Sequence, residues 1–308
     1  MKNKTLDIIG KKNLYFALSL IVVAPGLIAL LLFGLNLSID FTGGSRLTVS
    51  FGQNIEKQKI DSIKQSLISQ NIKVYTVEQS KNQVYFRTNP ISQKQNAHFV
   101  NELSKNFKDA KETEFETIGP TIGRETTINA IKAVFFASLL IILYITWSFR
   151  KVPKPASSLR FGVSAIIALI HDVLVVLGIF AILGHFFGVE VDSLFVTAIL
   201  TVIGFSVHDT IVVFDRIREN LRRSSQDSFP QIVNDSILQT LDRSLNTSLT
   251  VLLVLFALLL FGGETIRWFV VALLIGVTSG TYSSIFNASP ILVVWQEWSE
   301  KRKLKSKS

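Results

Sequence analysis

Five ionisable residues within or at the edge of long apolar segments are candidates for chemistry, because a charge is costly in such a segment. Four of them form two His-Asp pairs, His171-Asp172 and His208-Asp209, and the fifth is Arg243. An ionised side chain at the centre of a bilayer costs about 3 kcal/mol by the lower estimates, so such residues usually face a protein interior or water. Carboxylates and guanidinium groups in these positions can take up a proton or balance a charge.

The depth of these residues suggests which of them meet. If each apolar segment is a helix, Asp172 lies about 18 Å from the inner end of its segment, whereas Asp209 and Arg243 lie about 8–9 Å from theirs. We therefore expect Asp209 and Arg243 to pair and to act as a proton switch, because burial disfavours the charged carboxylate and a guanidinium favours it. The alternatives are a static salt bridge that joins two helices, or side chains that snorkel to the inner interface.

The histidines are expected to play a secondary part. His171 and His208 each precede an aspartate by one residue, so on a helix their side chains point about 100° away from it. We expect them to pack against a neighbouring helix or to line the same polar path, and we predict no metal site. The chain has no cysteine, which excludes disulfides, thiolate nucleophiles and Cys-based metal centres.

Hydroxyl and amide side chains extend this polar path along the last two apolar segments. In the fifth segment Asn246, Thr247, Ser248 and Thr250 follow Arg243. The sixth segment adds a larger polar set: Thr278, Ser279, Thr281, Tyr282, Ser283, Ser284 and Asn287. In the same segment Gly276 and Gly280 form a G-x-x-x-G motif, which allows close packing of helices.

The elements that carry these residues are six apolar runs, each about the 20 residues that a helix needs to cross a bilayer. Only 18% of the 308 residues are charged, whereas soluble chains average about 25%. The sequence therefore predicts an α-helical polytopic membrane protein with six transmembrane helices. The runs are residues 14–35, 128–148, 161–183, 194–214, a segment that ends at 261, and 268–294.

The distribution of Lys and Arg predicts the topology. Segments on one side carry four, four, five and five basic residues, whereas the short loops on the other side, 184–193 and 262–267, carry only Arg267. Basic residues collect on the cytoplasmic side, so both termini are expected there. This predicts a cytoplasmic N-terminus (1–13), helix 1 (14–35), an extracytoplasmic domain (36–127), helices 2–6 (128–296) and a basic cytoplasmic tail (297–308).

The segment 36–127 reads as an α+β domain. Alternating or apolar stretches predict strands at 46–51, 72–77, 84–87 and 113–118, with a turn at 81–82. Apolar residues at helical spacing predict helices at 55–69 and 92–107. The order β-α-β-β-α-β is that of a ferredoxin-like domain.

Four sequence blocks carry a resemblance to a known family. The first, Asp40-Phe41-Thr42-Gly43-Gly44, follows the first apolar run, and the others are ALIHD at 168–172, DTIVVFDRIREN at 209–220 and GTYSSIF at 280–286. By these blocks the chain resembles, over about residues 39–294, the SecF members of the bacterial SecD–SecF family. That family is related to the resistance–nodulation–division superfamily.

The resemblance implies a machine that uses the proton motive force to pull or release translocating chains on the outer side of the plasma (inner) membrane. It implies SecD, the SecYEG channel and the unfolded polypeptide as partners, allows YajC as another, and involves no nucleic acid, enzymatic activity or cofactor beyond the proton gradient. The family's proton-pathway aspartate and arginine fall on Asp209 and Arg243. His208 stands where many members have Asn.

Three other functions are alternatives. A proton-coupled exporter of small solutes usually repeats the six-helix set twice in one chain, and this chain holds one set. An intramembrane aspartyl protease would use Asp172 and Asp209 as a dyad, but their expected depths differ by about 10 Å. A passive scaffold for SecD would use the charges only for assembly, and Asp209→Asn separates it from a proton-coupled protein.

Overall fold

The computed structural model of the chain describes residues 6–52, 57–80, 82–107, 109–153, 156–223 and 227–305. These residues form two compact units. The helical unit comprises Met1–Leu35, Ala133–Val189 and Leu194–Ser308, and the sheet unit comprises Asn36–Lys132 and Glu190–Ser193. Several residues used for the sequence predictions lie outside the described residues: Lys2, Lys4, Ile55, Lys81, Lys154 and Lys307.

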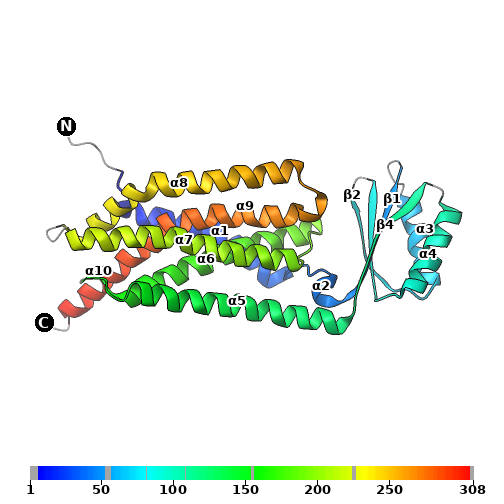
Figure 1. Ribbon diagram of the computed structural model, residues 1–308, viewed down its shortest axis with the longest axis horizontal. Helices are drawn as coiled ribbons and strands as arrows, with labels where there is room; N and C mark the ends of the chain where they lie inside the picture. Colours follow the sequence, from blue (N-terminus) through cyan, green and yellow to red (C-terminus); the bar gives the residue numbers. More distant parts are fainter. Residues whose placement is uncertain are drawn as a thin grey trace. The chain divides into compact units, whose positions relative to one another are not determined.

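Six helical stretches of the described residues are long and apolar enough to cross a membrane, which confirms the expected number. The first is α1 (Lys12–Phe33), preceded by a 3-10 turn (Ile9–Lys11). The next four are α5 (Pro120–Ser148), α6 (Ser158–Phe187), α7 (Ser193–Arg223) and α8 (Phe229–Phe261). The sixth combines α9 (Arg267–Ser283), a π-helical segment (Ser284–Ala288) and α10 (Ser289–Lys305), after a 3-10 turn (Glu264–Ile266) (Figure 1).

Several helices are longer than the apolar runs that revealed them. Helix α5 begins at Pro120 rather than at 128, α7 continues past 214 to Arg223, and α8 begins at Phe229. Hydropathy marks only the part of a helix that is apolar, whereas backbone hydrogen bonding continues through polar turns. Proline suits the first turn of α5 and of α8, since the first backbone N–H groups of a helix have no partner within it.

Glycines set the closest helix contacts of the helical unit. A Cβ atom on Gly26 of α1 would lie 2.8 Å from the Cα of Gly178 in α6, so these two backbones touch. A Cβ on Gly276 of α9 would lie 2.1 Å from Val202 of α7, and one on Gly280 would lie 3.0 Å from Ser206. The G-x-x-x-G motif thus faces α7, and the close approach brings the polar side chains of α7 and α9 together.

The sheet unit contains one antiparallel sheet with the strand order β2-β3-β1-β4. The strands are β1 (Gly44–Phe51), β2 (Val74–Ser80), β3 (Gln83–Thr88) and β4 (Ala110–Ile118). Helices α3 (Lys57–Ser69) and α4 (Gln93–Asn106) cover one face (Figure 1), and the short α2 (Ile39–Thr42) precedes β1. The core between sheet and helices consists of Leu47, Val49, Phe51, Ile60, Ile63, Leu67, Ile72, Val84, Phe86, Ile91, Phe99, Leu103 and Ala110.

The second strand begins later than expected. Ile72 is fully buried in the core, as its apolar character predicts, but it precedes β2. Asn71 has a φ of 61° and the Ile72 N–H donates to the Leu67 carbonyl at 3.1 Å, so both residues belong to the turn that ends α3. Asn tolerates this left-handed backbone better than most residues, which explains the end of the helix.

Candidate functional site

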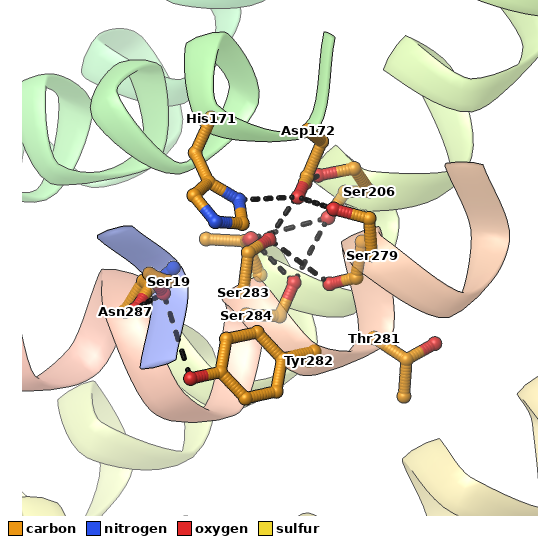
Figure 2. Close-up of polar contacts among 12 residues, drawn as sticks. Ser19, His171, Asp172, Ser206, Ser279, Thr281, Tyr282, Ser283, Ser284 and Asn287 are labelled. Carbon is orange, nitrogen blue, oxygen red and sulfur yellow. Dashed lines mark hydrogen bonds and ion pairs between the residues drawn. The ribbon is translucent and has the colours of Figure 1, made fainter. Parts of the chain in front are cut away.

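The carboxylate of Asp172 is enclosed by three serine hydroxyls from two other helices (Figure 2). Asp172 lies in α6 and is fully buried. Ser206 of α7 donates to its Oδ2 at 2.6 Å, Ser283 of α9 donates to the same oxygen at 2.6 Å, and Ser279 of α9 donates to Oδ1 at 2.7 Å. We call this group the Asp172 cage; its short bonds from hydroxyl donors stabilise a charged carboxylate.

His171 joins the cage from the same helix. Neighbouring side chains of a helix point about 100° apart, yet the imidazole turns back so that its Nδ1 lies 3.0 Å from Oδ1 of Asp172. Its Nε2 is buried and has no hydrogen-bond partner among the described residues. The ring lies 6.3 Å from that of Tyr282, between the cage and α1. His171 therefore contacts the aspartate directly.

Further polar contacts lie beside the cage, one between α7 and the π-helical segment and one between that segment and α1. Thr210 of α7 and Ser284 of the π-helical segment have their hydroxyl oxygens 2.8 Å apart. On the other side of the cage Ser19 of α1 donates to Asn287 at 2.9 Å (Figure 2). A π-helical turn within an α-helix is rare and frequently lies at a functional site; here Ser284 and Asn287 belong to it.

Asp209 has a different environment from Asp172. Only 2% of its surface is exposed, and its Oδ2 lies 3.4 Å from the hydroxyl of Ser248 in α8 and 3.4 Å from that of Thr281 in α9. The two hydroxyls are only 2.6 Å from each other. Both contacts of Asp209 are at the long limit of a hydrogen bond, so this buried carboxylate is poorly satisfied.

The structure does not bring Arg243 to Asp209. No ion pair between them occurs among the contacts of the described residues, and the side chain of Arg243 is exposed. The face of α8 that is directed toward Asp209 is that of Ser244 and Ser248, and Arg243 lies about 100° around the helix from Ser244. The sequence predicts the depth of Arg243 along its helix, whereas the direction of its side chain depends on how α8 is rotated about its axis. His208 is also exposed.

The buried polar face of α8 differs from the one expected. Asn246, Thr247 and Thr250 are exposed, whereas Ser248 is buried. Three buried hydroxyl residues precede Ser248 at intervals of four residues: Ser236, Thr240 and Ser244. We call these four the α8 hydroxyl face. The interval of four is the sequence signal that identifies it, because such residues share one side of a helix.

Two residues of the α8 hydroxyl face, Ser236 and Ser244, differ in their hydrogen bonding. At the beginning of this face Asn220 of α7 donates to the hydroxyl of Ser236 at 2.8 Å. The hydroxyl of Ser244 is buried without a hydrogen-bond partner among the described residues. A buried hydroxyl of this kind is costly and rare, so its position between Thr240 and Ser248 is a candidate functional feature.

The motif Asp40-Phe41-Thr42-Gly43-Gly44 forms α2 and the start of β1 in the sheet unit. Phe41 is buried, and the Thr42 hydroxyl donates to the Ser38 carbonyl at 3.0 Å. Gly43 and Gly44 have φ values of 70° and 130°, which L side chains rarely adopt. The glycines therefore allow the sharp change of direction from α2 into the strand.

The described residues contain no group of three or more His, Asp or Glu side chains that could hold a metal ion. Within the same part of the chain, no hydrogen bond joins the carboxylates of Asp172 and Asp209, each of which contacts its own hydroxyls. An aspartyl-protease dyad requires two carboxylates that share a proton, and this arrangement does not provide one.

The fold and the site define a polytopic membrane protein whose helices enclose two carboxylates and a series of hydroxyl groups. Comparison with known families identifies the protein family. The family described as "Protein export membrane protein SecD/SecF, C-terminal" matches residues 98–298, and the "SecD/SecF GG Motif" matches residues 28–55. The chain belongs to the SecD/SecF family and, within it, to the SecF subunits of the Sec translocase.

Relatives and solved structures agree with this assignment. The chain is 50% identical to the protein translocase subunit SecF of Thermobaculum terrenum and 46% identical to that of Anaerolinea thermophila, over 94–96% of each chain. The crystal structure of SecDF, a translocon-associated membrane protein from Thermus thermophilus, is 33% identical with a TM-score of 0.83. That match covers 96% of this chain but 39% of the SecDF chain.

Proposed function

We propose that this chain is a proton-motive-force-coupled accessory subunit that acts with SecD to pull or release preproteins on the outer side of the membrane. The observation that carries the proposal is Asp209, a buried carboxylate with two 3.4 Å hydroxyl contacts and no ion pair among the residues that the structure describes. Burying a charge without a partner costs several kcal/mol, and proton binding removes this cost. Asp209 is therefore the residue that takes up and releases the proton.

The residues around Asp209 provide a route for the proton and hydrogen bonds that change when Asp209 is protonated. The α8 hydroxyl face leads to Asp209 through Ser244 and Ser248, and Thr281 connects it to α9. A neutral Asp209 can donate a hydrogen bond, whereas a charged one only accepts, so each protonation reverses its contacts with Ser248 and Thr281. Arg243, on the exposed side of α8, balances the charge from the surface that faces SecD.

Asp172 and the histidines complete the proposed pathway. Asp172, held by the short hydrogen bonds of the cage and by His171, serves either as a fixed negative charge or as a second residue that binds a proton. His208 lies exposed beside Asp209 and would exchange protons with it. No enzymatic activity and no cofactor other than the proton gradient is proposed.

The proposal includes a location and an assembly. We place both termini in the cytoplasm of a bacterial plasma membrane and the sheet unit, as a ferredoxin-like domain, on the outer side. The basic flanks of the helices support this orientation. A related protein from Bacillus subtilis is named protein translocase subunit SecDF, and this chain covers 38% of it, which supports SecD as the partner. SecYEG, YajC and the translocating polypeptide are further proposed partners.

The test is export of a secreted reporter in cells that depend on this chain. Asp209→Asn keeps the size of the side chain but cannot be protonated, so export should slow by at least about tenfold, as is typical when a proton-transfer group is lost. Asp215→Asn is the matched control, because Asp215 lies in the same helix but is 56% exposed in an ion pair with Arg218. Co-purification of SecD must be intact in both variants. Normal export with Asp209→Asn contradicts the proposal.

One observation favours a second candidate function, a passive scaffold for SecD. The exposed position of Arg243 suits a charge that joins two subunits rather than one that conducts protons. A scaffold predicts that Arg243→Met loses co-purified SecD while Asp209→Asn exports normally. The proposed function predicts the reverse for Asp209→Asn, so the two variants separate the candidates.

A further inference from the structure

The loop Glu190–Ser193, which connects α6 to α7, is fastened to the sheet unit through its backbone. The Val191 N–H donates to the Asn36 carbonyl at 2.7 Å, and the Ser38 N–H donates to the Val191 carbonyl at 2.9 Å. Leu37 and Val191 thereby form an isolated parallel β-bridge. The loop is thus paired with the segment that leads into α2, although about 150 residues separate them in the sequence.

Asp40 of the family motif holds the end of this loop. Its Oδ2 accepts hydrogen bonds from the backbone N–H of Ser193 at 2.8 Å and from the Ser193 hydroxyl at 2.7 Å. Ser193 is the first residue of α7, the helix that carries Asp209 sixteen residues further on. The first N–H groups of a helix lack partners within it, and a carboxylate there also interacts favourably with the helix dipole.

Glu190 holds the beginning of the loop on the helix-free face of the sheet. Its carboxylate lies 3.2 Å from Nη1 of Arg87 and 3.9 Å from Nη1 of Arg46, two residues that are directly opposite each other on β3 and β1. Arg87 also donates to the Thr42 hydroxyl at 2.6 Å. Arg87 therefore connects the loop to the family motif.

The same motif contacts the beginning of α5. A Cβ on Gly43 would lie 2.8 Å from the Cα of Pro120, and a Cβ on Gly123 would lie 2.7 Å from the Gly43 nitrogen. The backbone of the motif and the first turns of α5 are therefore in contact, and only glycine allows this approach. The motif thus contacts the first residues of two long helices, α5 and α7.

We propose that Asp40 and Glu190 are positioning residues that fasten the start of α7 to the sheet unit, so that a displacement of α7 is transmitted to that unit through the loop Glu190–Ser193. The inference rests on the proposed function for the displacement itself, which protonation of Asp209 would cause. The fastening is a separate claim, because it concerns only contacts within the sheet unit.

A cysteine pair at the β-bridge reports on the fastening. Neighbouring strands lie about 4.8 Å apart, within the range of about 4.4–6.8 Å that disulfide-linked Cα atoms span. The chain has no cysteine of its own, so Leu37→Cys with Val191→Cys can form only this intramolecular disulfide. The rate of its formation is measured under mild oxidation in membranes that contain the full chain and SecD.

Asp40 variants in this background test the inference. Asp40→Ala should slow disulfide formation roughly fivefold, as expected for the loss of a helix cap. Asp40→Asn should restore the parental rate, because an amide oxygen accepts the same two hydrogen bonds. Asp61→Ala, an exposed residue of α3, is the matched control and should leave the rate unchanged. Equal rates in Asp40→Ala and the parent overturn the inference.

Glu190→Gln provides an independent variant where Asp40→Ala fails to assemble with SecD. It removes the charge that pairs with Arg87 and Arg46, and it should also slow disulfide formation. An unchanged rate in Glu190→Gln counts against the part assigned to Glu190.

Export then separates fastening from proton coupling. Asp40→Ala should slow export, and the oxidised cysteine pair should restore it, because a covalent bond replaces the lost contact; reduction should remove the rescue. Slow export with Asp209→Asn but normal export with Asp40→Ala refutes the coupling through the loop and leaves the proposed function intact. Normal export with Asp209→Asn, together with rescue of Asp40→Ala, supports the positioning role and contradicts proton coupling.

Discussion

Three serine hydroxyls lie 2.6–2.7 Å from the carboxylate of Asp172, whereas Asp209 has two hydroxyl contacts at 3.4 Å. Hydrogen bonds to a charged acceptor are worth about 1.5–3 kcal/mol each in proteins when they are short. The cage therefore offsets much of the cost of burying a charge at Asp172, and Asp209 lacks this compensation. The hydroxyl neighbours of the two aspartates therefore give them different electrostatic environments.

The cage predicts a measurable loss of stability when one donor is removed. Ser283→Ala should lower the stability of the chain by about 1 kcal/mol, within the range measured for hydrogen bonds between membrane helices. Thr278→Val is the matched control, because Thr278 lies in the same helix but is exposed and bonds to the Leu274 carbonyl of its own helix. Thermal unfolding in detergent, followed by tryptophan fluorescence, should show a lower Tm for Ser283→Ala than for Thr278→Val. Equal Tm values would refute the stabilising role of the cage.

A second residue-scale prediction concerns Glu78 of β2 in the sheet unit. Burial and the neighbouring Glu190 raise the pKa of Glu78 to about 7, although Arg87 and Arg46 oppose the shift. The folded state therefore holds a proton between pH 4.5 and 7 that the unfolded state has released. Because the folded state binds more protons in this window, stability should fall as the pH rises through it and level off above pH 7.

The effect of Glu78 is expected to be on the order of 1 kcal/mol, since solvent screens a partly exposed group. Hydrogen exchange of β2 and β3 in the full chain, corrected for the intrinsic effect of pH on exchange, measures it. Glu78→Gln should lose less protection between pH 5 and pH 7.5 than the parent does, because Glu78 no longer contributes to the change. A parent with pH-independent protection would show that Glu78 does not titrate in this window.

At the scale of single elements, α8 has three faces with different character. One is the α8 hydroxyl face, which is buried. A second carries exposed polar residues, among them Arg243, Asn246 and Thr247. A third carries exposed apolar residues such as Leu245 and Leu249, typical of contact with lipid. Because each face is defined by rotation about the helix axis, a shift of a few residues along the sequence moves a side chain from one face to another.

This separation predicts opposite effects of one substitution on stability and on export. Ser244→Ala removes a buried hydroxyl without a partner among the described residues, so stability should rise by about 1 kcal/mol. Export should slow, because the α8 hydroxyl face then lacks a member between Thr240 and Ser248. Thr247→Val also removes a hydroxyl from α8, but an exposed one bonded to the Arg243 carbonyl, and should change neither property. Faster or equal export with Ser244→Ala would contradict the hypothesis that the α8 hydroxyl face carries protons to Asp209.

The helices and strands show which parts of the structure can be predicted from the sequence alone. Apolar runs and period-two or period-four patterns predicted six spanning helices and the β-α-β-β-α-β order, because each pattern reports burial within one segment. They did not predict the Asp172 cage, since its three serines reach one carboxylate only through the contact of α6, α7 and α9. The predicted ion pair between Arg243 and Asp209 is not found among the described residues for a similar reason. The sequence gives the position of Arg243 along α8, but the direction of its side chain depends on how the helix is rotated in the packed bundle.

At the scale of the whole molecule, the surface of the helical unit indicates a larger assembly. The chain covers 39% of the length of the Thermus thermophilus SecDF chain, which holds SecD and SecF together. Arg243 lies exposed on a helix that also presents exposed apolar side chains such as Leu245 and Leu249, and a guanidinium in a bilayer needs a partner or water. We therefore expect the exposed polar residues of α8 to face SecD.

Substitution by tryptophan tests which face of α8 meets SecD. Asn246→Trp places a large side chain on the exposed polar face, one helical turn from Arg243. It should reduce co-purification of SecD by at least about fivefold, since overpacking an interface costs about 1–3 kcal/mol. Leu249→Trp places the same side chain on the exposed apolar face, where lipid can yield to it, and should leave SecD bound. The tagged chain is purified in mild detergent, and the ratio of SecD to tagged chain is measured by quantitative immunoblotting. If Leu249→Trp loses SecD and Asn246→Trp retains it, the apolar face is the interface, and Arg243 must then find its partner in water or within this chain.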